Sequence, residues 1–135
     1  MNMEEVKAFM KEVGWGDLAT SDGKVVGVRP MGGWAWVEGE LWCASAIPTA
    51  KTDQLAAVPY AEYCFNGDAG KHARIAGPCT VSTDAGDKQT LYNAVPGIHG
   101  HVDGPTGPGW AVLRLKPERV RMISPDFTYE EVPLD

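Results

Sequence analysis

The sequence predicts a mainly β fold, a barrel or a sandwich with short flanking helices. The chain has 135 residues, enough for one domain, and 44% of them are hydrophobic against 22% charged, which is typical of a folded protein. Short segments of alternating apolar and polar residues recur, separated by turns about every eight to twelve residues. That spacing favours antiparallel strands over a parallel sheet. We therefore expect residues 1–135 to form a single domain.

Each expected element follows from its own pattern. Apolar residues recur at helical spacing from Val6 to Val13 before Gly14, so residues 1–14 should form a helix that covers one end of the domain. A second helix should begin near Thr49 and end at Pro59. A weaker helix is expected over residues 84–95. Alternation and turn residues predict strands at 17–20, 24–31, 34–37, 41–45, 60–66, 72–82, 110–116 and 120–123.

Two segments lack any periodic pattern. Residues 96–109 are rich in glycine and proline and should form a loop, which could close over a ligand. Residues 124–135 form an acidic tail, which we expect to pack loosely or to reach a partner subunit.

Composition excludes several classes of function. The formal net charge of −6 argues against broad binding to nucleic acids or anionic membranes. No apolar run is long enough to span a membrane, and the amino terminus lacks the features of a secretion signal, so a cytoplasmic location is expected. Cys43, Cys64 and Cys79 are widely spaced in expected strands, which favours reduced thiols over a disulfide or a metal site.

One stretch predicts a phosphate site. A strand ending in small and hydroxylated residues leads through Pro48 to the helix that starts near Thr49. A helix start offers unpaired N–H groups and a partial positive charge, to which Lys51 adds a full charge. Arg29 ends another strand among apolar neighbours and needs an anionic partner there. Alternatively, Arg29 pairs with a carboxylate of the protein and Lys51 is solvated.

Other candidate sites are weaker. Two histidines and an aspartate between His99 and Asp103 could begin a metal site, but no third ligand is evident at the right distance, so no metal is predicted. Trp34 and Trp36 share one strand face and could line a planar ligand, although packing in the core or at a dimer interface is the default. No dinucleotide fingerprint and no nucleophile with a partner base is found.

Short motifs occur in the order and spacing of a known family. They are Gly-Asp-Leu-Ala-Thr at residues 16–20, Val-Arg-Pro-Met at 28–31, Trp-Cys-Ala-Ser at 42–45, Thr-Ala-Lys at 49–51 before Leu-Ala-Ala-Val-Pro at 55–59, and Ala-Arg-Ile-Ala-Gly at 73–77. From about residue 17 to 123 the chain resembles the FMN-binding split barrels of the pyridoxamine 5'-phosphate oxidase family. The resemblance implies a six-stranded antiparallel split β-barrel of Greek-key type and a homodimer with FMN at its interface.

The resemblance also implies which residues bind FMN. Its phosphate would be held by Arg29, Thr49 and Lys51, with Ala50 inside the same turn. The backbone of Pro30 and Met31 would follow the isoalloxazine edge. Three further residues would contact the ring, the ribityl chain or the flavin of the second subunit: Ala44, Ser45 and, across the dimer, His72.

Departures from the family pattern limit the implied reaction. The family's oxidases have a lysine five positions after the strand arginine, where this chain has Trp34, and an arginine where it has Ala50. Their carboxy-terminal Arg-x-His segment has no match in residues 124–129. Oxidation of pyridoxamine phosphate is therefore not expected, and the chain looks more like short flavin reductases, nitroimidazole-resistance-like proteins and stress-associated flavin binders.

Two main functions remain open at this point. The first is an FMN-dependent oxidoreductase that passes electrons to a small acceptor, with NAD(P)H as a candidate donor. The second is a non-catalytic module that stores or senses flavin, or that holds haem or a deazaflavin instead. A plainer third possibility is an acidic partner-binding domain without a cofactor.

Overall fold

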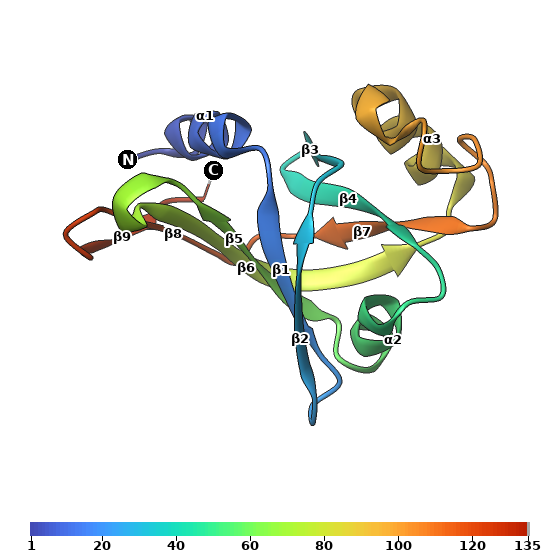
Figure 1. The fold of residues 1–135 in the computed structure, drawn as a ribbon, viewed down its shortest axis with the longest axis horizontal. Coiled ribbons are helices and arrows are strands. Elements are labelled where there is room, and N and C mark those ends of the chain that lie inside the picture. The colour runs from blue at the N-terminus through green and yellow to red at the C-terminus, as the bar shows by residue number, and fades with distance from the viewer. Residues whose placement is uncertain (135) are drawn as a thin grey trace.

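One antiparallel sheet curls on itself to form most of the molecule (Figure 1), in a computed structural model that describes residues 1–134. Its strands are β1 (Gly16–Ser21), β2 (Val26–Met31), β3 (Trp34–Val37), β4 (Glu40–Ala46), β5 (Tyr60–Asn66), β6 (His72–Ser82), β7 (Trp110–Leu115), β8 (Arg119–Ile123) and β9 (Tyr129–Val132). The helices are α1 (Met3–Val13), α2 (Ala50–Ala57) and α3 (Ala85–Ala94), with short 3-10 turns at Asp68–Gly70 and Pro96–Ile98.

The sheet is split into two halves, and the long central strand β6 pairs with strands of both. The strand order is β2-β1-β5-β6-β7-β4-β3, and β8 also pairs with β6 and with β9. The first part of β6 pairs with β8 and its last part with β7, with Gly77 between them. A Cβ at Gly77 would collide with the backbone of Lys116, so glycine lets the chain cross β6 closely as it passes from β7 to β8.

The two ends of this strand path are consecutive in the chain. β2 and β3 are joined only by Gly32 and Gly33, and Gly33 adopts a φ of 63°. The chain therefore bends at these two glycines. It brings the two ends of the curled sheet to one place, beside the end of β4.

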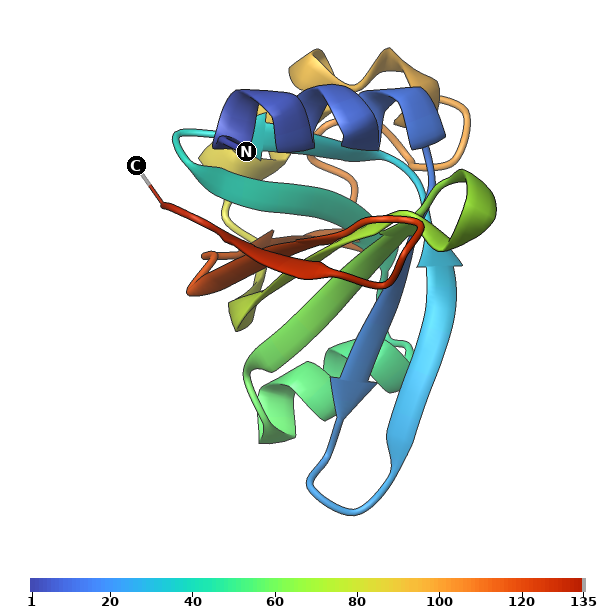
Figure 2. The same cartoon turned by 90° about the vertical axis from the view of Figure 1, so that its left-hand side faces the viewer.

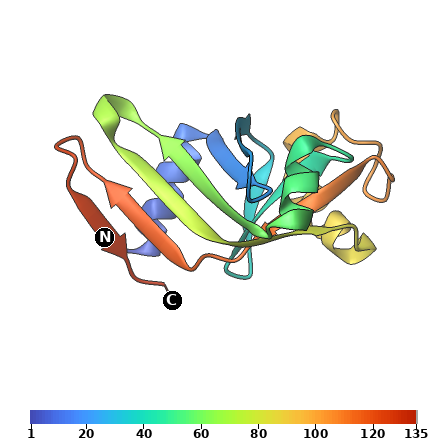
Figure 3. The ribbon, with the colours of Figure 1, turned by 90° about the horizontal axis from the view of Figure 1, so that it is seen from below.

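The helices cover both sides of the sheet. Figure 2 shows α1 across one end and α2 near the other, and Figure 3 shows α2 from below, beside the strands. Helix α1 starts with a capping box between Asn2 and Glu5 and buries Met3, Val6 and Met10. It ends at Gly14, as the sequence predicts.

Two apolar clusters form the core. The larger lies between α1 and the sheet and includes Leu18, Tyr63, Phe65 and Ile75, all at most 1% exposed. The smaller lies under α3, where its buried members are Trp42, Leu91, Ile98, Trp110 and Val112. The 3-10 turn that contains Ile98 is thus packed into the protein rather than free in solvent.

The structure confirms the predicted mainly β split barrel with flanking helices, and it adds to the strand count. Residues 1–134 contain nine strands, whereas the sequence pattern predicts eight and the family resemblance implies six. The prediction of a loosely packed tail over residues 124–135 was wrong within the described range, because Tyr129–Val132 pairs with β8 and Val132 is 4% exposed. The three cysteines are free, with Cys43 and Cys79 buried and Cys64 half-buried. Across residues 1–134, every helix is too short or too polar for a transmembrane span.

Candidate functional site

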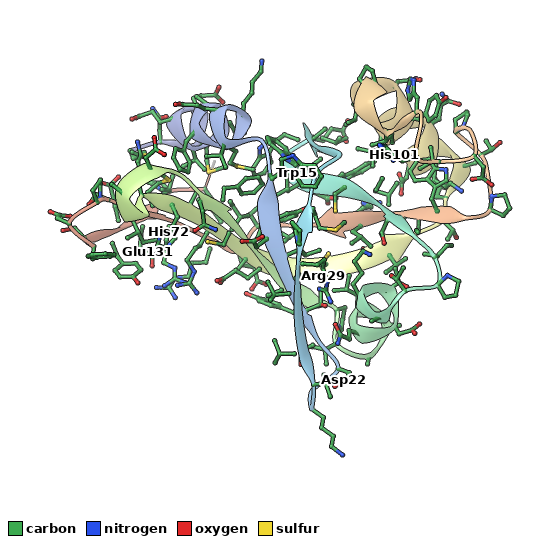
Figure 4. The ribbon with its side chains drawn as sticks, in the orientation of Figure 1. Trp15, Asp22, Arg29, His72, His101 and Glu131 are labelled. Carbon is green, nitrogen blue, oxygen red and sulfur yellow. The ribbon has the colours of Figure 1, made fainter. Side chains whose placement is uncertain are left out.

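Arg29 is held in place between β1 and α2. Its side chain is half-buried on the inner face of β2, where Nη1 donates to the Leu18 carbonyl at 3.1 Å and to Thr20 Oγ1 at 2.7 Å. Nη2 donates to Gln54 Oε1 at 3.4 Å, and Thr20 also donates to that oxygen. Figure 4 shows Arg29 between the β1–β2 hairpin and α2. Neutral groups therefore orient the guanidinium without neutralising it.

Gly27 makes room for this arrangement. It precedes Arg29 by two residues on the same face of β2, and a Cβ there would collide with the Arg29 guanidinium. The side chain folds back over Gly27 towards α2. Without that space, the same hydrogen bonds to Thr20 and Gln54 could not form in this geometry.

Lys51 supplies a second cation near Arg29. Neither Arg29 nor Lys51 forms an ion pair with a carboxylate in residues 1–134. The alternative interpretation, in which Arg29 pairs with a carboxylate of the protein, is therefore not supported in the described chain. Burial lowers the pKa of Arg29. The pKa of Lys51 is also lowered, first by burial and then by the charge of Arg29. Two neighbouring, partly buried cations without a carboxylate partner in the described chain are able to receive an anion.

The start of α2 adds backbone donors at this place. Thr49 caps the helix: its hydroxyl accepts from the Thr52 N–H at 3.4 Å, and its own N–H donates to Thr52 Oγ1 at 3.0 Å. No acceptor within the described chain takes the N–H of Ala50 or Lys51. These two N–H groups lie at the amino-terminal end of α2, where the partial positive charge of the helix favours an anion.

A cavity of about 530 Å³ begins one residue after Arg29 in the chain, although Arg29, Thr49 and Lys51 themselves do not line it. It is lined by Pro30 to Gly33 at the end of β2, by Ala44 to Ala46 at the end of β4, and by residues between Val95 and Trp110. Four predicted site residues are thus brought together, namely Pro30, Met31, Ala44 and Ser45. The volume lies within the usual range for small-molecule sites, about 300 to 1,000 Å³.

Residues 95–109 form one wall of this cavity, which we call the lid. Helix α3 holds the lid with one face, because Lys88, Leu91 and Tyr92 are three and four residues apart. The buried ammonium of Lys88 donates to the Gly107 carbonyl and lies 5.0 Å from the Trp110 ring centroid. Leu91 packs in the cluster of Ile98, and Tyr92 stacks on the His99 ring at 3.8 Å. The loop expected to close over a ligand is thus an ordered part of the cavity.

Several residues that the sequence singled out lie elsewhere. Trp34 and Trp36 pack against the larger core cluster, with Trp34 5.3 Å from the Phe65 ring, so core packing is confirmed for them. His72 starts β6 at the far end of the sheet from Arg29 (Figure 4), and its Nδ1 lies 2.8 Å from the Gly70 carbonyl oxygen. Its contact with a flavin of the second subunit stays a prediction.

The two histidines of the lid differ in their surroundings. His99 Nε2 forms a hydrogen bond with the Tyr92 carbonyl at 2.7 Å, whereas His101 lines the cavity. Among residues 1–134, no group of three or more His, Cys, Asp or Glu side chains is arranged to hold a metal ion.

The sequence did not identify every residue of the site. Trp15, 63% exposed, lines the cavity beside Gly32. Thr20 and Gln54, which orient Arg29, were also missed. Trp15 precedes β1 as a single exposed aromatic residue without any periodic pattern, so only its exposure could have indicated a role.

The arrangement suits a ligand with an anionic end and a flat, apolar body. Two segments connect the cationic end to the cavity. In β2, Arg29 directly precedes the lining residue Pro30, and after β4 the chain runs from the lining residue Ala46 to the start of α2. Charge-assisted hydrogen bonds would hold the anion, and apolar walls would hold the body.

Solved structures with this fold include one protein described as FMN binding and one described as heme binding. A NimC/NimA family protein of Clostridium acetobutylicum matches with a TM-score of 0.83 and 24% identity, over 97% of this chain and 91% of that one. An FMN binding protein of Nostoc punctiforme, related to pyridoxamine 5'-phosphate oxidase, matches at 0.68 and 17%, over 96% and 95%. A heme binding protein of Mycobacterium smegmatis matches at 0.74 and 18%, over 96% of this chain and 56% of that one.

At these identities the structural matches establish the fold and no more. No curated protein matches the chain. The sequence itself matches the family model described as pyridoxamine 5'-phosphate oxidase over residues 3–124, which is nearly its whole length. The chain belongs to the pyridoxamine 5'-phosphate oxidase family.

Proposed function

We propose that the protein binds FMN, with the phosphate at Arg29, Lys51 and the start of α2 and the isoalloxazine ring in the adjoining cavity. One observation carries this proposal: two partly buried cations lie close together and have no carboxylate partner in the described chain. A phosphate would satisfy both cations and the free N–H groups of Ala50 and Lys51 at once.

The chemistry of the site supports FMN over smaller anions. A free phosphate would leave the apolar cavity empty, whereas FMN has a phosphate at one end and a planar ring system at the other. Ala44 and Ser45 line the cavity, as the family resemblance implies for residues beside the ring. A family relative from Nostoc punctiforme is described as FMN binding, which agrees with this assignment.

We also propose that two copies of the chain form a dimer that covers the exposed face of β2. Val26 and Val28 on this edge strand are 74% and 68% exposed. An apolar face on an unpaired strand edge favours association with another chain. In such a dimer, His72 of the second copy would complete the flavin site.

Bound FMN would supply the redox chemistry, with NAD(P)H as the electron donor and a small molecule as the acceptor. The protein would hold the phosphate, orient the ring through Pro30, Met31 and the end of β4, and exclude water with the lid. Trp34, which stands where the family's oxidases have a lysine, is packed on Phe65 and offers no charge to a substrate phosphate. Pyridoxamine phosphate is therefore not proposed as the substrate.

The visible spectrum of the purified protein tests flavin binding. We expect either co-purified flavin absorption or quenching of FMN fluorescence at one FMN per chain. A colourless protein that leaves FMN fluorescence unchanged would contradict the proposal. Replacement of Val28 by glutamate should dissociate the dimer in sedimentation and weaken FMN binding, and an unchanged dimer would contradict the assigned interface.

A binding function without catalysis is the second candidate. The relative from Mycobacterium smegmatis is described as heme binding, and the imidazole of His101 on the cavity wall could ligate an iron. A haem spectrum in place of a flavin spectrum would favour this candidate. Bound flavin that stays oxidised under excess NADH and NADPH would instead favour storage or sensing of flavin.

A further inference from the structure

Polar groups on the cavity wall are few, and most are already used. Ser45 Oγ donates to the Ala46 carbonyl at 2.9 Å, and Trp110 Nε1 donates to the Gly104 carbonyl at 2.9 Å. Two other lining side chains, Trp15 and His101, make no hydrogen bond within residues 1–134. Figure 4 shows His101 beside α3 and Trp15 between α1 and α3, both above Arg29 in that view.

We infer that Trp15 and His101 form a substrate subsite that selects a small, flat, uncharged molecule with a hydrogen-bond acceptor. This inference deepens the proposed function, on which it rests for the claim that the bound molecule is a substrate. Trp15 offers an exposed aromatic ring for stacking. His101 offers the ring nitrogen that donates to a carbonyl or heterocyclic acceptor.

The charge of the cavity wall determines which molecules are excluded. His101 is the one titratable side chain that lines the cavity in the described chain, and no lysine, arginine, aspartate or glutamate lines it. A carboxylate or phosphate on the substrate would enter an apolar space without a fixed cation, which is unfavourable. An ammonium group would likewise find no carboxylate. The cations that could receive an anion, Arg29 and Lys51, would be occupied by the FMN phosphate.

The position of His101 depends on the lid. His99 is stacked on Tyr92, and Ile98 is 5% exposed in the smaller core cluster, so the chain on the amino-terminal side of His101 is fixed. The Gly107 carbonyl is bound to Lys88 on the other side. The backbone at His101 is thus fixed beside the cavity, and the exposed imidazole makes no hydrogen bond within residues 1–134. That combination is expected of a group that meets a ligand.

Benzamide and benzoate test this inference, since they have nearly the same size and shape and differ in charge. Binding to the full chain loaded with FMN is followed by the visible spectrum of the flavin. Binding to the FMN-free chain, with inorganic phosphate in excess, is followed by tryptophan fluorescence, because Trp15 and Trp110 line the cavity. We expect benzamide to bind at least about tenfold more tightly than benzoate.

Variants identify the residue responsible. His101→Ala should weaken benzamide binding by about 2- to 12-fold, the value of one hydrogen bond, and His101→Gln should recover part of the loss. Thr106→Ala, a change at an exposed residue of the same lid that does not line the cavity, should leave benzamide binding unchanged. Equal binding of benzoate, or an unaltered affinity in His101→Ala, would overturn the inference. A protein that binds benzamide as expected but no FMN would contradict the proposed function instead.

Discussion

Replacement of Lys51 by methionine tests the phosphate site most directly. Methionine keeps much of the volume of the side chain and removes its charge. In the proposed complex this deletes one charge-assisted hydrogen bond to the phosphate, worth about 1.5 to 3 kcal/mol. That range corresponds to roughly 12- to 140-fold in affinity for FMN. Lys51 is only partly buried, so water screens its charge and the loss should lie near the lower end.

Riboflavin makes this prediction specific, because it carries the same ring and ribityl chain without the phosphate. Lys51→Met should weaken FMN and leave the affinity for riboflavin unchanged within a factor of about two. The two ligands and two proteins form a cycle in which only the contact between Lys51 and the phosphate differs. Titration of flavin fluorescence measures all four affinities.

Lys24→Met is the matched control. Lys24 is exposed at the tip of the β1–β2 hairpin. Its replacement removes the same net charge from the protein as Lys51→Met does. It should not alter FMN binding. Because Lys51 lies near Arg29, its removal also relieves repulsion, so the free energy of unfolding should stay equal or rise slightly. Equal losses for FMN and riboflavin, or the same loss in Lys24→Met, would refute the assignment of the phosphate site.

Three further predictions concern the same region and the lid. The pKa of Lys51 is lowered in the free protein, and a bound phosphate would raise it again. FMN affinity should therefore fall as the pH rises through the lowered pKa of Lys51, below its usual 10.5, and Lys51→Arg should flatten this profile in fluorescence titrations. Gly27→Ala should displace the Arg29 guanidinium and weaken FMN several-fold, with an unchanged circular dichroism spectrum. Lys88→Met should free the Gly107 carbonyl, so that hydrogen exchange speeds up across the lid while β5 and β6 keep their protection.

The fold was predictable where strand alternation and turn residues agree. The strands at 34–37, 60–66 and 72–82 have the bounds expected from the sequence, because each alternates between turns rich in glycine, proline or acidic residues. Strand β9 was missed because Tyr129–Val132 has only one residue, Val132, that enters the core. What stabilises β9 is its pairing with β8 and an ion pair between Arg119 and Glu131, and neither is visible in a local pattern.

The cationic half of the site was predictable from local sequence. Arg29 stands among apolar residues in a strand, and Lys51 stands in the first turn of a helix, so each has an unusual neighbourhood that a reader of the sequence can identify. The apolar half was not predictable in this way. Trp15, His101 and Trp110 come from three separate elements, and only the curl of the sheet and the packing of α3 bring them to one cavity. Conversely, the shared face of Trp34 and Trp36 could not distinguish core packing from a ligand wall.

The two halves of the site should therefore contribute to different properties. Arg29 and Lys51 attract an anion locally although the protein as a whole carries a charge of −6, because a distant charge is screened within about 10 Å while a neighbouring one is not. These residues should set the affinity for FMN. Trp15 and His101 contact no charged group of the cofactor in the proposed arrangement, so they should set which second molecule enters. Suppose instead that substitutions at His101 altered FMN affinity as strongly as those at Lys51. In that case His101 and Lys51 would bind the same ligand, and the division of the site into a cofactor end and a substrate end would be wrong.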